Sequence, residues 1–326
     1  MKKFKRTKRV LIAFAVLIIF IFLNNTSFFS KNSDTDNLLL AHRGVAQTFT
    51  MEGIEWDTCT AERIYEPEHG FPENTIPSIE AAFEAGADIV EFDIKRTKDN
   101  QFAVFHDGTL ECRSNGSGEP SEYTMEELKH LDIGYGYTAD GGKTYPFRGK
   151  GIGQMPSMDE VLSKFPNKNL LIHIKSSNPE DGKLLVEFLM KMPKEQLGFL
   201  TVYGDDEPIA VLQEKLPELR VMSIATLKSC LLPYIGIGWT GFVPSACDNT
   251  QLHIPEKFAP FFWGFPNKFV DRMEKANTRV ILVAGDGGWS EGFDTEQDLE
   301  RLPEDYRGGI WTNSIEKIAP ILEKKG

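Results

Sequence analysis

Hydrophobic positions along the chain form short apolar runs, and several of these runs are separated by stretches with an apolar residue at every third or fourth position. From residue 38 onward, nine runs have the length and composition of strands: 38–41, 89–94, 170–174, 199–203, 219–224, 241–244, 261–264, 280–284 and 309–312. Helical periodicity occurs at 78–85, 183–190, 208–215, 268–276 and 315–322. This alternation predicts an α/β fold with a parallel sheet. The number of repeats favours a (β/α)8 TIM barrel, and the absence of a GxGxxG motif after the first run argues against a dinucleotide-binding sheet.

The first 37 residues have a different pattern. Residues 10–23 are an unbroken apolar run of 14 residues, and Lys2, Lys3, Lys5, Arg6, Lys8 and Arg9 precede it. A positively charged segment followed by an apolar run is typical of an export signal, and the basic end of such a segment stays inside the cell. As a helix the run spans about 21 Å, less than the roughly 30 Å of a bilayer core. The length favours a cleaved signal peptide, whereas the lack of a clean small-x-small cleavage site favours a membrane anchor.

We therefore expect residues 1–37 to be a signal peptide or membrane anchor with a short linker, and residues 38–326 to be an extracytoplasmic catalytic barrel. The protein would be secreted, or anchored to the membrane by its N-terminal segment. Its four cysteines suit that compartment, because exported proteins keep disulfides. We expect the pairs Cys59–Cys112 and Cys230–Cys247, with four buried free thiols as the alternative. None of the four has CxxC spacing, so neither a zinc site nor a redox motif is indicated.

The formal net charge of −12 argues against a nucleic-acid partner, which normally requires a basic surface. Six of the positive charges lie in the first nine residues, so the remainder of the chain carries −18. Residues 107–154 are rich in Gly, Ser, Asp and Tyr and interrupt the strand–helix pattern. We interpret them as an insertion after the second strand.

Candidate catalytic residues occur where the predicted strands end, which is where barrel enzymes place their active sites. Glu91 and Asp93 are two residues apart on one strand, so their side chains point to the same face, while Phe92 points away. His173 and Lys175 likewise share a face. Two carboxylates inside a barrel are costly unless a cation joins them, which favours a divalent metal ion. Salt bridges to neighbouring Lys or Arg residues are the alternative.

Three of the six histidines, His42, His106 and His173, lie at strand ends. The other three, His69, His130 and His253, lie in segments that we interpret as loops or surface. With Arg43, Lys175 and the two carboxylates, the first three provide a base, an acid and positive charge. Phosphodiester cleavage needs these groups.

At these positions the sequence resembles the glycerophosphodiester phosphodiesterase family. The similarity is densest between residues 38 and 107, is clear again at 170–175, and rests on these motifs: His42-Arg43-Gly44, Pro72-Glu73-Asn74-Thr75, Gly86-Ala87-Asp88, Val90-Glu91-Phe92-Asp93 and His106-Asp107. Residues 309–318 look like the family's last strand and helix. The resemblance implies a TIM barrel, a divalent cation and hydrolysis of a glycerophosphodiester to an alcohol and glycerol phosphate.

The resemblance also implies a role for each matching residue. His42 and His106 would be the general acid–base pair, with Arg43 and Lys175 as phosphate-binding cations and Glu73 as a supporting residue. Glu91 and Asp93 would bind the metal. The family usually has a glutamate where this chain has His173, and an imidazole ligand favours Zn or Mn relative to Ca. The cation is thus Ca, Mg, Mn or Zn, and the alternative is that His173 binds no metal.

The substrate is expected to be a small glycerophosphodiester or a lipid-derived molecule, with membrane contact through the N-terminal segment. Aromatic residues near the later strand ends, with Trp311 foremost, are candidates for substrate binding; the others are Phe261, Phe262, Trp263, Phe265 and Trp289. Three alternative functions use the same residues: a phospholipase D-like enzyme or lyase acting on choline phospholipids, a hydrolase of glycerol-phosphate polymers of the cell envelope, and a non-catalytic extracytoplasmic binding protein.

Overall fold

Eight parallel strands form a nearly closed barrel in the computed structural model, which describes residues 2–29, 37–55, 58–288, 291–303 and 305–324. The strands follow one another around the barrel in the order β1 (Leu38–Ala41), β2 (Ile89–Arg96), β4 (Asn169–Ile174), β5 (Leu200–Gly204), β6 (Arg220–Met222), β7 (Gln251–Pro255), β8 (Arg279–Val283) and β9 (Gly309–Thr312). β9 pairs with β1, whereas β6 and β7 meet only at the bridge between Val221 and Thr250. The predicted (β/α)8 fold is confirmed.

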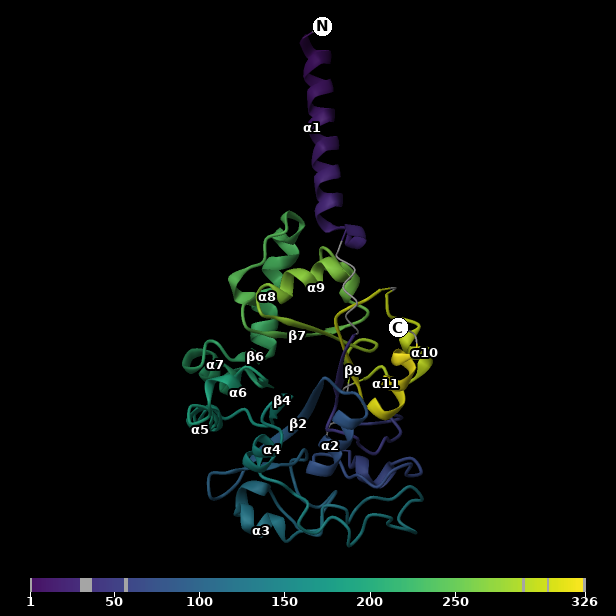
Figure 1. Cartoon of the computed structure of the whole chain (residues 1–326), viewed down its shortest axis with the longest axis vertical. Helices are drawn as coiled ribbons and strands as arrows, with labels where there is room; N and C mark the ends of the chain where they lie inside the picture. Colours follow the sequence, from purple (N-terminus) through teal and green to yellow (C-terminus); the bar gives the residue numbers. More distant parts are fainter. Residues whose placement is uncertain (1, 30–36, 56–57, 289–290, 304, 325–326) are drawn as a thin grey trace.

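Helices outside the strands cover the barrel (Figure 1). They are α2 (Ile76–Glu84), α4 (Met158–Lys164), α5 (Pro179–Leu189), α6 (Lys194–Leu197), α7 (Asp206–Lys215), α8 (Ile224–Ile237), α9 (Asn267–Glu274), α10 (Glu296–Leu299) and α11 (Ile315–Glu323). The main hydrophobic core lies between strands and helices, and Phe92 belongs to it. A smaller cluster inside the barrel contains Leu40, Ile89, Leu171, Ile281 and Trp311. This division follows the alternation of side chains along each strand.

Two of the nine predicted strands are wrong. Residues 241–244 lie between the short 3-10 helices η4 (Gly238–Thr240) and η5 (Ser245–Cys247), and residues 261–264 overlap η6 (Ala259–Phe261) and the turn after it. The strand between these two segments, β7, was not predicted, and its His253 is not a loop residue. The 14-residue helix α8 was also missed, because its composition is apolar on nearly every side. Its first residue, Ile224, had been assigned to a strand.

The segment between β2 and β4 has a hydrophobic core of its own. It begins with β3 (Phe102–Val104), which runs antiparallel to β2, and it includes η3 (Pro120–Glu122) and α3 (Met125–Lys129). Phe105, Leu110, Leu128 and Met155 are buried in this second core. Cys112 joins the segment to Cys59, next to η2 (Thr60–Arg63), and the second disulfide joins Cys230 to Cys247. The expected cysteine pairs are therefore those of the structure.

The N-terminal helix α1 (Lys2–Asn25) projects from the barrel domain (Figure 1). Its segment Thr7–Asn25 has the length and hydropathy of a membrane-spanning helix, with a mean hydropathy of 2.1, and none of it is buried against the domain. A short 3-10 helix, η1 (Ser27–Phe29), follows it. An exposed apolar helix near the N-terminus is the feature that both a signal sequence and an anchor share.

Candidate active site

Glu91, Asp93 and His173 meet inside the barrel mouth because β2 and β4 pair in register. Asp93 lies beside His173 in the sheet, and Glu91 lies beside Leu171. One potential ligand atom from each of the three residues falls within 4.8 Å of the others. The Asp93 Oδ1 atom is buried 2.9 Å from His173 Nδ1, yet it makes no well-formed hydrogen bond. A buried carboxylate oxygen left without a donor is what a cation site needs, so this group of residues fits a divalent ion.

The electrostatics of the two carboxylates differ. Burial raises the pKa of Glu91 well above its usual value, and the neighbouring Asp93 adds to the effect. Burial also opposes ionisation of Asp93, but the charges of His106 and Arg43 hold its pKa well below the usual value. Glu91 accepts hydrogen bonds from the Tyr203 hydroxyl at 2.8 Å and from the Arg43 amide at 3.0 Å. Burial lowers the pKa of His173 to about 4, which leaves a neutral imidazole able to bind a metal.

Arg43 is placed over the carboxylates by a turn that begins as soon as β1 ends. Arg43 and Gly44 have φ angles of 63° and 78°, in the left-handed region. At Gly44 a side chain is also sterically excluded, because a Cβ atom would lie 2.7 Å from the backbone of Ser78. The Arg43 guanidinium donates to Glu73 at 2.9 Å and lies 3.4 Å from Asp93 Oδ2. The turn thus fixes a cation beside the candidate metal site.

The Glu73-Asn74-Thr75 motif has three separate structural tasks. Glu73 binds Arg43, and Asn74 clamps Asp93 by donating to its carboxylate and accepting from its amide, both at 2.9 Å. The Thr75 side chain caps α2 by accepting from the Ser78 amide. One short motif therefore orients Arg43, aligns a metal-site carboxylate and begins a helix.

His42 is oriented by a chain of hydrogen bonds from the other side of the barrel. Its Nδ1 atom lies 2.6 Å from Asn313 Oδ1, and the Asn313 side chain in turn donates to Asp294 at 2.8 Å. The Arg43 Nε group donates to His42 Nε2 at 3.2 Å. Burial, with a further contribution from Arg43, lowers the pKa of His42 well below its usual value. These partners assign the proton to Nδ1 and leave Nε2 as a base.

His106 is oriented in a similar way by the segment that follows β3. Its Nδ1 atom lies 2.7 Å from Asp107 Oδ1, and the Lys175 ammonium is 3.3 Å from its Nε2 atom. Asp107 also pairs with the buried Arg113, which donates to Glu73 at 3.1 Å and to the Thr60 hydroxyl at 2.6 Å. Burial makes the largest contribution to lowering the pKa of His106, and the positive charge of Arg43 makes the next largest. Arg113 thus connects the group that holds His106 to the group that holds Arg43.

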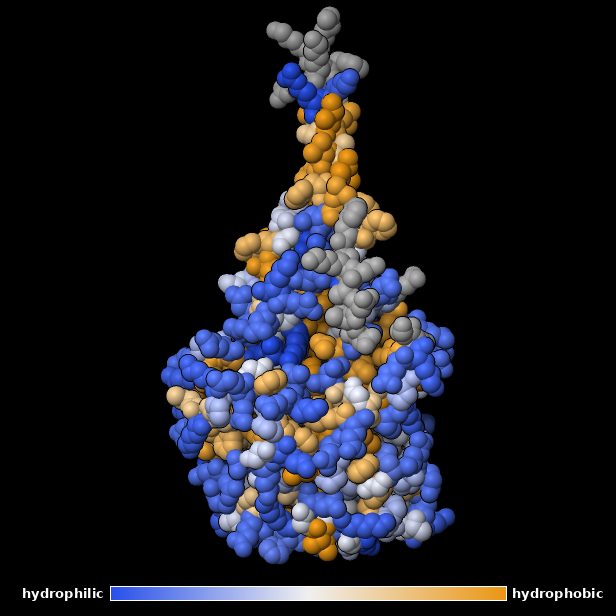
Figure 2. Space-filling view, in the orientation of Figure 1, coloured by the Kyte–Doolittle hydropathy of each residue, from blue (hydrophilic) through white to orange (hydrophobic). Residues whose placement is uncertain are grey.

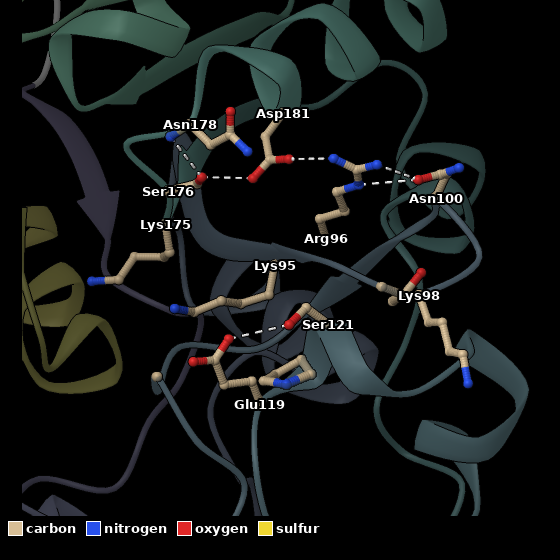
Figure 3. A pocket seen from close by; sticks show the side chains of 13 residues that line it. Lys95, Arg96, Lys98, Asn100, Glu119, Ser121, Lys175, Ser176, Asn178 and Asp181 are labelled. Carbon is tan, nitrogen blue, oxygen red and sulfur yellow. Dashed lines mark hydrogen bonds and ion pairs between the residues drawn. The ribbon is translucent and has the colours of Figure 1, made fainter.

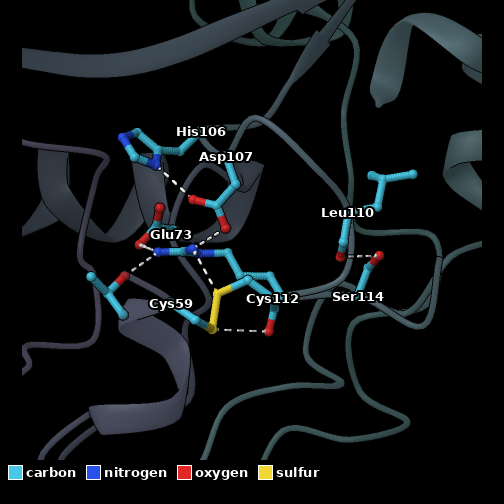
Figure 4. Close-up of a disulfide and its surroundings, with 9 residues drawn as sticks. Cys59, Glu73, His106, Asp107, Leu110, Cys112 and Ser114 are labelled. Carbon is cyan, nitrogen blue, oxygen red and sulfur yellow. Dashed lines mark hydrogen bonds and ion pairs between the residues drawn. A yellow bond between two sulfur atoms is a disulfide. The ribbon is translucent and has the colours of Figure 1, made fainter. Parts of the chain in front are cut away.

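A disulfide fixes this connection, because Arg113 follows Cys112 directly (Figure 4). The Arg113 guanidinium also lies 5.9 Å from the centre of the Tyr137 ring. The disulfide, the ion pairs and the ring bury Arg113, which is 3% exposed, and burial makes each of its ion pairs sensitive to the loss of a partner.

A cavity of about 750 Å³ opens in front of both histidines. Arg43, Glu73, Lys175 and Asn313 reach it, together with apolar side chains from the loop between β1 and α2, among them Phe49, Met51 and Ile54. The loop after β8 contributes Gly285, Glu291 and Gly292. His42, His106, Arg43 and Lys175 therefore face one space that is large enough for a small phosphodiester.

The predicted aromatic pocket is not formed by the residues expected. Trp311 is 3% exposed and lies under His42 at a ring distance of 4.6 Å, so it supports that histidine and does not line the cavity. Phe262 and Phe265 pack with the core, and Phe261 and Trp263 are exposed beside η6, outside the cavity. Trp289 falls outside the described residues. The loop after β1 supplies the apolar wall instead.

A second, polar cavity of about 430 Å³ adjoins the first and shares Lys175 with it. The Lys95 and Lys175 side chains extend toward the same side of it (Figure 3). Arg96, Lys98, Ser121 and Ser176 contribute further polar groups, and Glu119 and Asp181 contribute carboxylates. Burial lowers the pKa of Lys95 most, and the positive charge of Lys175 lowers it further.

Several residues that complete the site were not singled out from the sequence: Asn74, Arg113, Tyr203, Asp294 and Asn313. Asn74 stood inside a quoted motif, and Asn313 follows a predicted strand end, so both could have been found by position. Arg113 gave no such signal, because it lies inside the insertion and its ion pair with Glu73 joins segments distant in the chain.

The comparison with known families agrees with this geometry. The sequence profile of the Glycerophosphoryl diester phosphodiesterase family matches residues 42–235, more than half of the chain. The chain belongs to this family. In this family member the matched region begins at His42 and includes every residue assigned above to the metal site or to acid–base chemistry.

Two relatives match over most of their length. The glycerophosphodiester phosphodiesterase of Caldanaerobacter subterraneus is 29% identical over 261 residues, which cover 78% of this chain and 94% of the relative. An uncharacterized protein of Bacillus subtilis is 31% identical over 260 residues, which cover 78% of this chain and 95% of the relative.

Solved structures show the same fold. The glycerophosphoryl diester phosphodiesterase domain of an uncharacterized Mycobacterium tuberculosis protein has a TM-score of 0.61 at 14% identity, covering 89% of this chain and all of that domain. A phosphodiesterase of Oleispira antarctica, solved with sn-glycerol-3-phosphate as its product, has a TM-score of 0.56 at 18% identity, covering 88% of this chain and 97% of that chain.

Proposed function

We propose that the protein is a metal-dependent phosphodiester hydrolase that cleaves glycerophosphodiesters to an alcohol and glycerol phosphate. One observation carries the proposal: His42 and His106 face the same cavity, and each has its Nδ1 atom held by an acceptor and its Nε2 atom next to a cation, Arg43 or Lys175. Two imidazoles of this kind on either side of an anion-binding space fit general acid–base catalysis on a phosphodiester.

In this mechanism the phosphate lies between Arg43 and Lys175, where its oxygens replace the contacts that the two cations now make with the histidines. His42 removes the proton of the attacking hydroxyl, from water or from the glycerol unit itself. His106 acts in its protonated form: with its Nδ1–H held by Asp107, it gives the Nε2 proton to the leaving alkoxide and becomes neutral. When the glycerol hydroxyl attacks, a cyclic phosphate forms first and water opens it.

The proposed cofactor is a divalent ion held by Glu91, Asp93 and His173. When bound, such an ion neutralises charge on the non-bridging phosphate oxygens. Support comes from the ligand atoms within 4.8 Å of one another and from the unsatisfied Asp93 Oδ1. Asn74 holds the other Asp93 oxygen, so the carboxylate is already oriented before a metal arrives.

We also infer an extracytoplasmic location for residues 38–326, with residues 1–37 as signal or anchor. The apolar helix α1 with its basic N-terminal flank supports this, and so do the two disulfides, which persist in an oxidising compartment.

The test is turnover by the purified full chain on a panel of glycerophosphodiesters, choline phospholipids and glycerol-phosphate polymers. Each substrate is assayed with chelator and then with Mg, Ca, Mn or Zn. We expect release of glycerol phosphate that chelator abolishes and one or more metals restore. Stable release of a cyclic phosphate as the final product would identify a lyase. Substrate binding without turnover under any condition would identify a binding protein and contradict the proposal.

A further inference from the structure

Large apolar side chains gather on the outside of the domain around the end of α1. The group, here called the apolar rim, comprises Leu232, Ile235, Ile237, Phe242, Phe261 and Trp263, and their exposed fractions range from 37% to 75%. They come from α8, the segment after η4, and the loop between β7 and α9. Figure 2 shows the hydrophobic surface of α1 continuing onto this end of the domain. Side chains of this size are seldom exposed together in water.

Hydrogen bonds place the end of α1 at the apolar rim without a spacer. The side chains of Asn24 and Asn25 both donate to the Trp239 carbonyl in η4, at 3.0 and 2.8 Å. The Ser27 hydroxyl lies 3.3 Å from the carbonyl of Gly264, which follows Trp263 directly, and Arg272 donates to the Asn24 carbonyl at 2.8 Å. The apolar residues of α1 therefore end at the level where the apolar rim begins.

We propose that the apolar rim rests in the interfacial layer of a lipid bilayer into which α1 inserts. The segment Thr7–Asn25 of α1 is long enough to cross a bilayer, but its unbroken apolar run spans only about 21 Å, so the apolar rim extends the apolar surface at the end of that run. Trp263 and the phenylalanines are residue types that prefer this layer. A cavity of about 400 Å³ at the same place is lined by Asn24, Lys268, Arg272, Lys275 and the carboxylate of Asp248, and its excess of positive charge fits an anionic phospholipid head group.

The test uses the full chain in vesicles of phosphatidylcholine and phosphatidylglycerol that carry bromine at carbons 6 and 7 of the acyl chains. Bromine quenches tryptophan emission on contact. We expect quenching in the unchanged protein, and we expect Trp263→Phe to remove a large part of the quenched emission. Trp311→Phe is the matched control, because that buried tryptophan should contribute nothing to it.

Two results would overturn the proposal. If aqueous iodide, but not brominated lipid, quenches the emission that Trp263→Phe removes, the apolar rim faces water. If neither reagent reaches Trp263, another polypeptide covers the apolar rim. Neither result depends on enzymatic activity.

A separate observation concerns the polar cavity beside the catalytic one. Lys95 follows Glu91 and Asp93 on the same face of β2, so its ammonium points out of the barrel mouth toward Lys175. Among the described residues neither lysine forms an ion pair with a carboxylate. Asp181, in contrast, is occupied by Arg96 at 3.1 Å and by the Ser176 hydroxyl at 2.6 Å, and Glu119 accepts from the Ser121 hydroxyl at 3.1 Å. Lys95 and Lys175 thus place two cations without a carboxylate partner next to the proposed site of cleavage.

We infer that this cavity holds a second phosphate of the substrate, an inference that rests on the proposed function. The favoured substrates are then diesters in which a further phosphate follows the cleaved one, separated by a short polyol. Lys175 would contact both phosphates, because it lines both cavities, whereas Lys95 would contact only the second.

The test compares Lys95→Gln with the unchanged protein on two substrates, a glycerophosphodiester with one phosphate and a dimer of glycerol phosphate with a second one. Loss of one charge-assisted contact should raise KM for the dimer about tenfold and leave the other KM within about twofold. Lys143→Gln, at an exposed position that lines neither cavity, is the control and should change neither. An equal rise for both substrates, or none, would overturn the inference.

Calorimetric binding of the uncleaved dimer separates this inference from the proposed function. If turnover is absent but Lys95→Gln still weakens binding of the dimer more than binding of glycerol phosphate, the second site stands and the hydrolase does not. If turnover is present and the two substrates respond alike, the hydrolase stands and the second site does not.

Discussion

Two histidines lie on either side of Tyr203, and they show how differently the two walls of the barrel are built. His173 stacks on Tyr203 with ring centres 4.0 Å apart, and His253 approaches the same ring edge-on at 5.5 Å. Burial lowers the pKa of both, to about 4 and about 3. Yet His173 faces Asp93, whereas His253 contacts the Gln251 side chain at 2.8 Å and the Trp311 ring at 5.1 Å.

The comparison teaches that burial and a shifted pKa do not make a functional histidine; its neighbours do. The wall formed by β1, β2 and β4 carries the paired carboxylates and the two cations, which are expensive to bury and therefore need a ligand or one another. The wall formed by β7, β8 and β9 supplies aromatic packing and a hydrogen-bond chain through Asn313 to His42. The second wall therefore holds His42, a side chain of the first wall, in position.

The largest expected effect follows from removing either of the two histidines proposed for acid–base catalysis. His42→Ala and His106→Ala should each lower kcat at least about 10²-fold, because each removes a proton-transfer step, while the circular dichroism spectrum stays unchanged. The measurement is initial-rate turnover of a soluble glycerophosphodiester. His130→Ala, at an exposed position, is the control. Full activity in either of the first two variants would contradict the acid–base assignment.

The next effect concerns the buried ion pairs behind the first wall. Arg113→Met would leave Glu73 and Asp107 without their shared cation, and breaking a buried pair costs about 3–5 kcal/mol of unfolding free energy. We expect a lower Tm and a lower kcat, because His106 loses an oriented Asp107. Arg148→Met, an exposed position stacked on Tyr145, is the control. An unchanged Tm would show that the two carboxylates find other partners.

The sequence predicted the first wall far better than the second, for a physical reason. On β2 and β4 apolar residues alternate with positions that carry a few chemically distinctive side chains. The sequence therefore shows directly which face of the strand each side chain occupies. On β7 the inward positions are Gln251 and His253, which break the apolar pattern, so the strand was missed.

The two false strands, 241–244 and 261–264, were predicted from apolar residues that in fact lie outside the barrel. Phe242, Phe261 and Trp263 are exposed near the end of α1. A hydrophobic pattern assumes that apolar residues avoid the outside of the molecule, and that assumption fails for these two segments, whose apolar side chains are exposed. The contributions of Arg113 and Asp294 could not be predicted either, because they depend on contacts between segments distant in the chain.

The third effect is a change in metal preference. His173→Glu adds one negative charge to the group formed with Glu91 and Asp93, and hard cations prefer oxygen ligands. We expect activity supported by Ca or Mg to rise relative to activity supported by Zn or Mn by about tenfold or more, measured by metal titration after chelation. An unchanged metal profile would show that His173 is not a ligand.

The smallest effect is expected at the second histidine, and it makes the comparison decisive. His253→Phe keeps an aromatic ring against Tyr203 and Trp311 and removes only the contact with Gln251. Because His253 forms no ion pair with a carboxylate among the described residues, kcat should stay within about threefold, and the metal profile should be unchanged. The same titration used for His173→Glu measures both. If His253→Phe shifted the metal preference as strongly as His173→Glu, the cation would have to lie between the two walls near Tyr203, and the assignment of the metal to the carboxylate wall alone would fail.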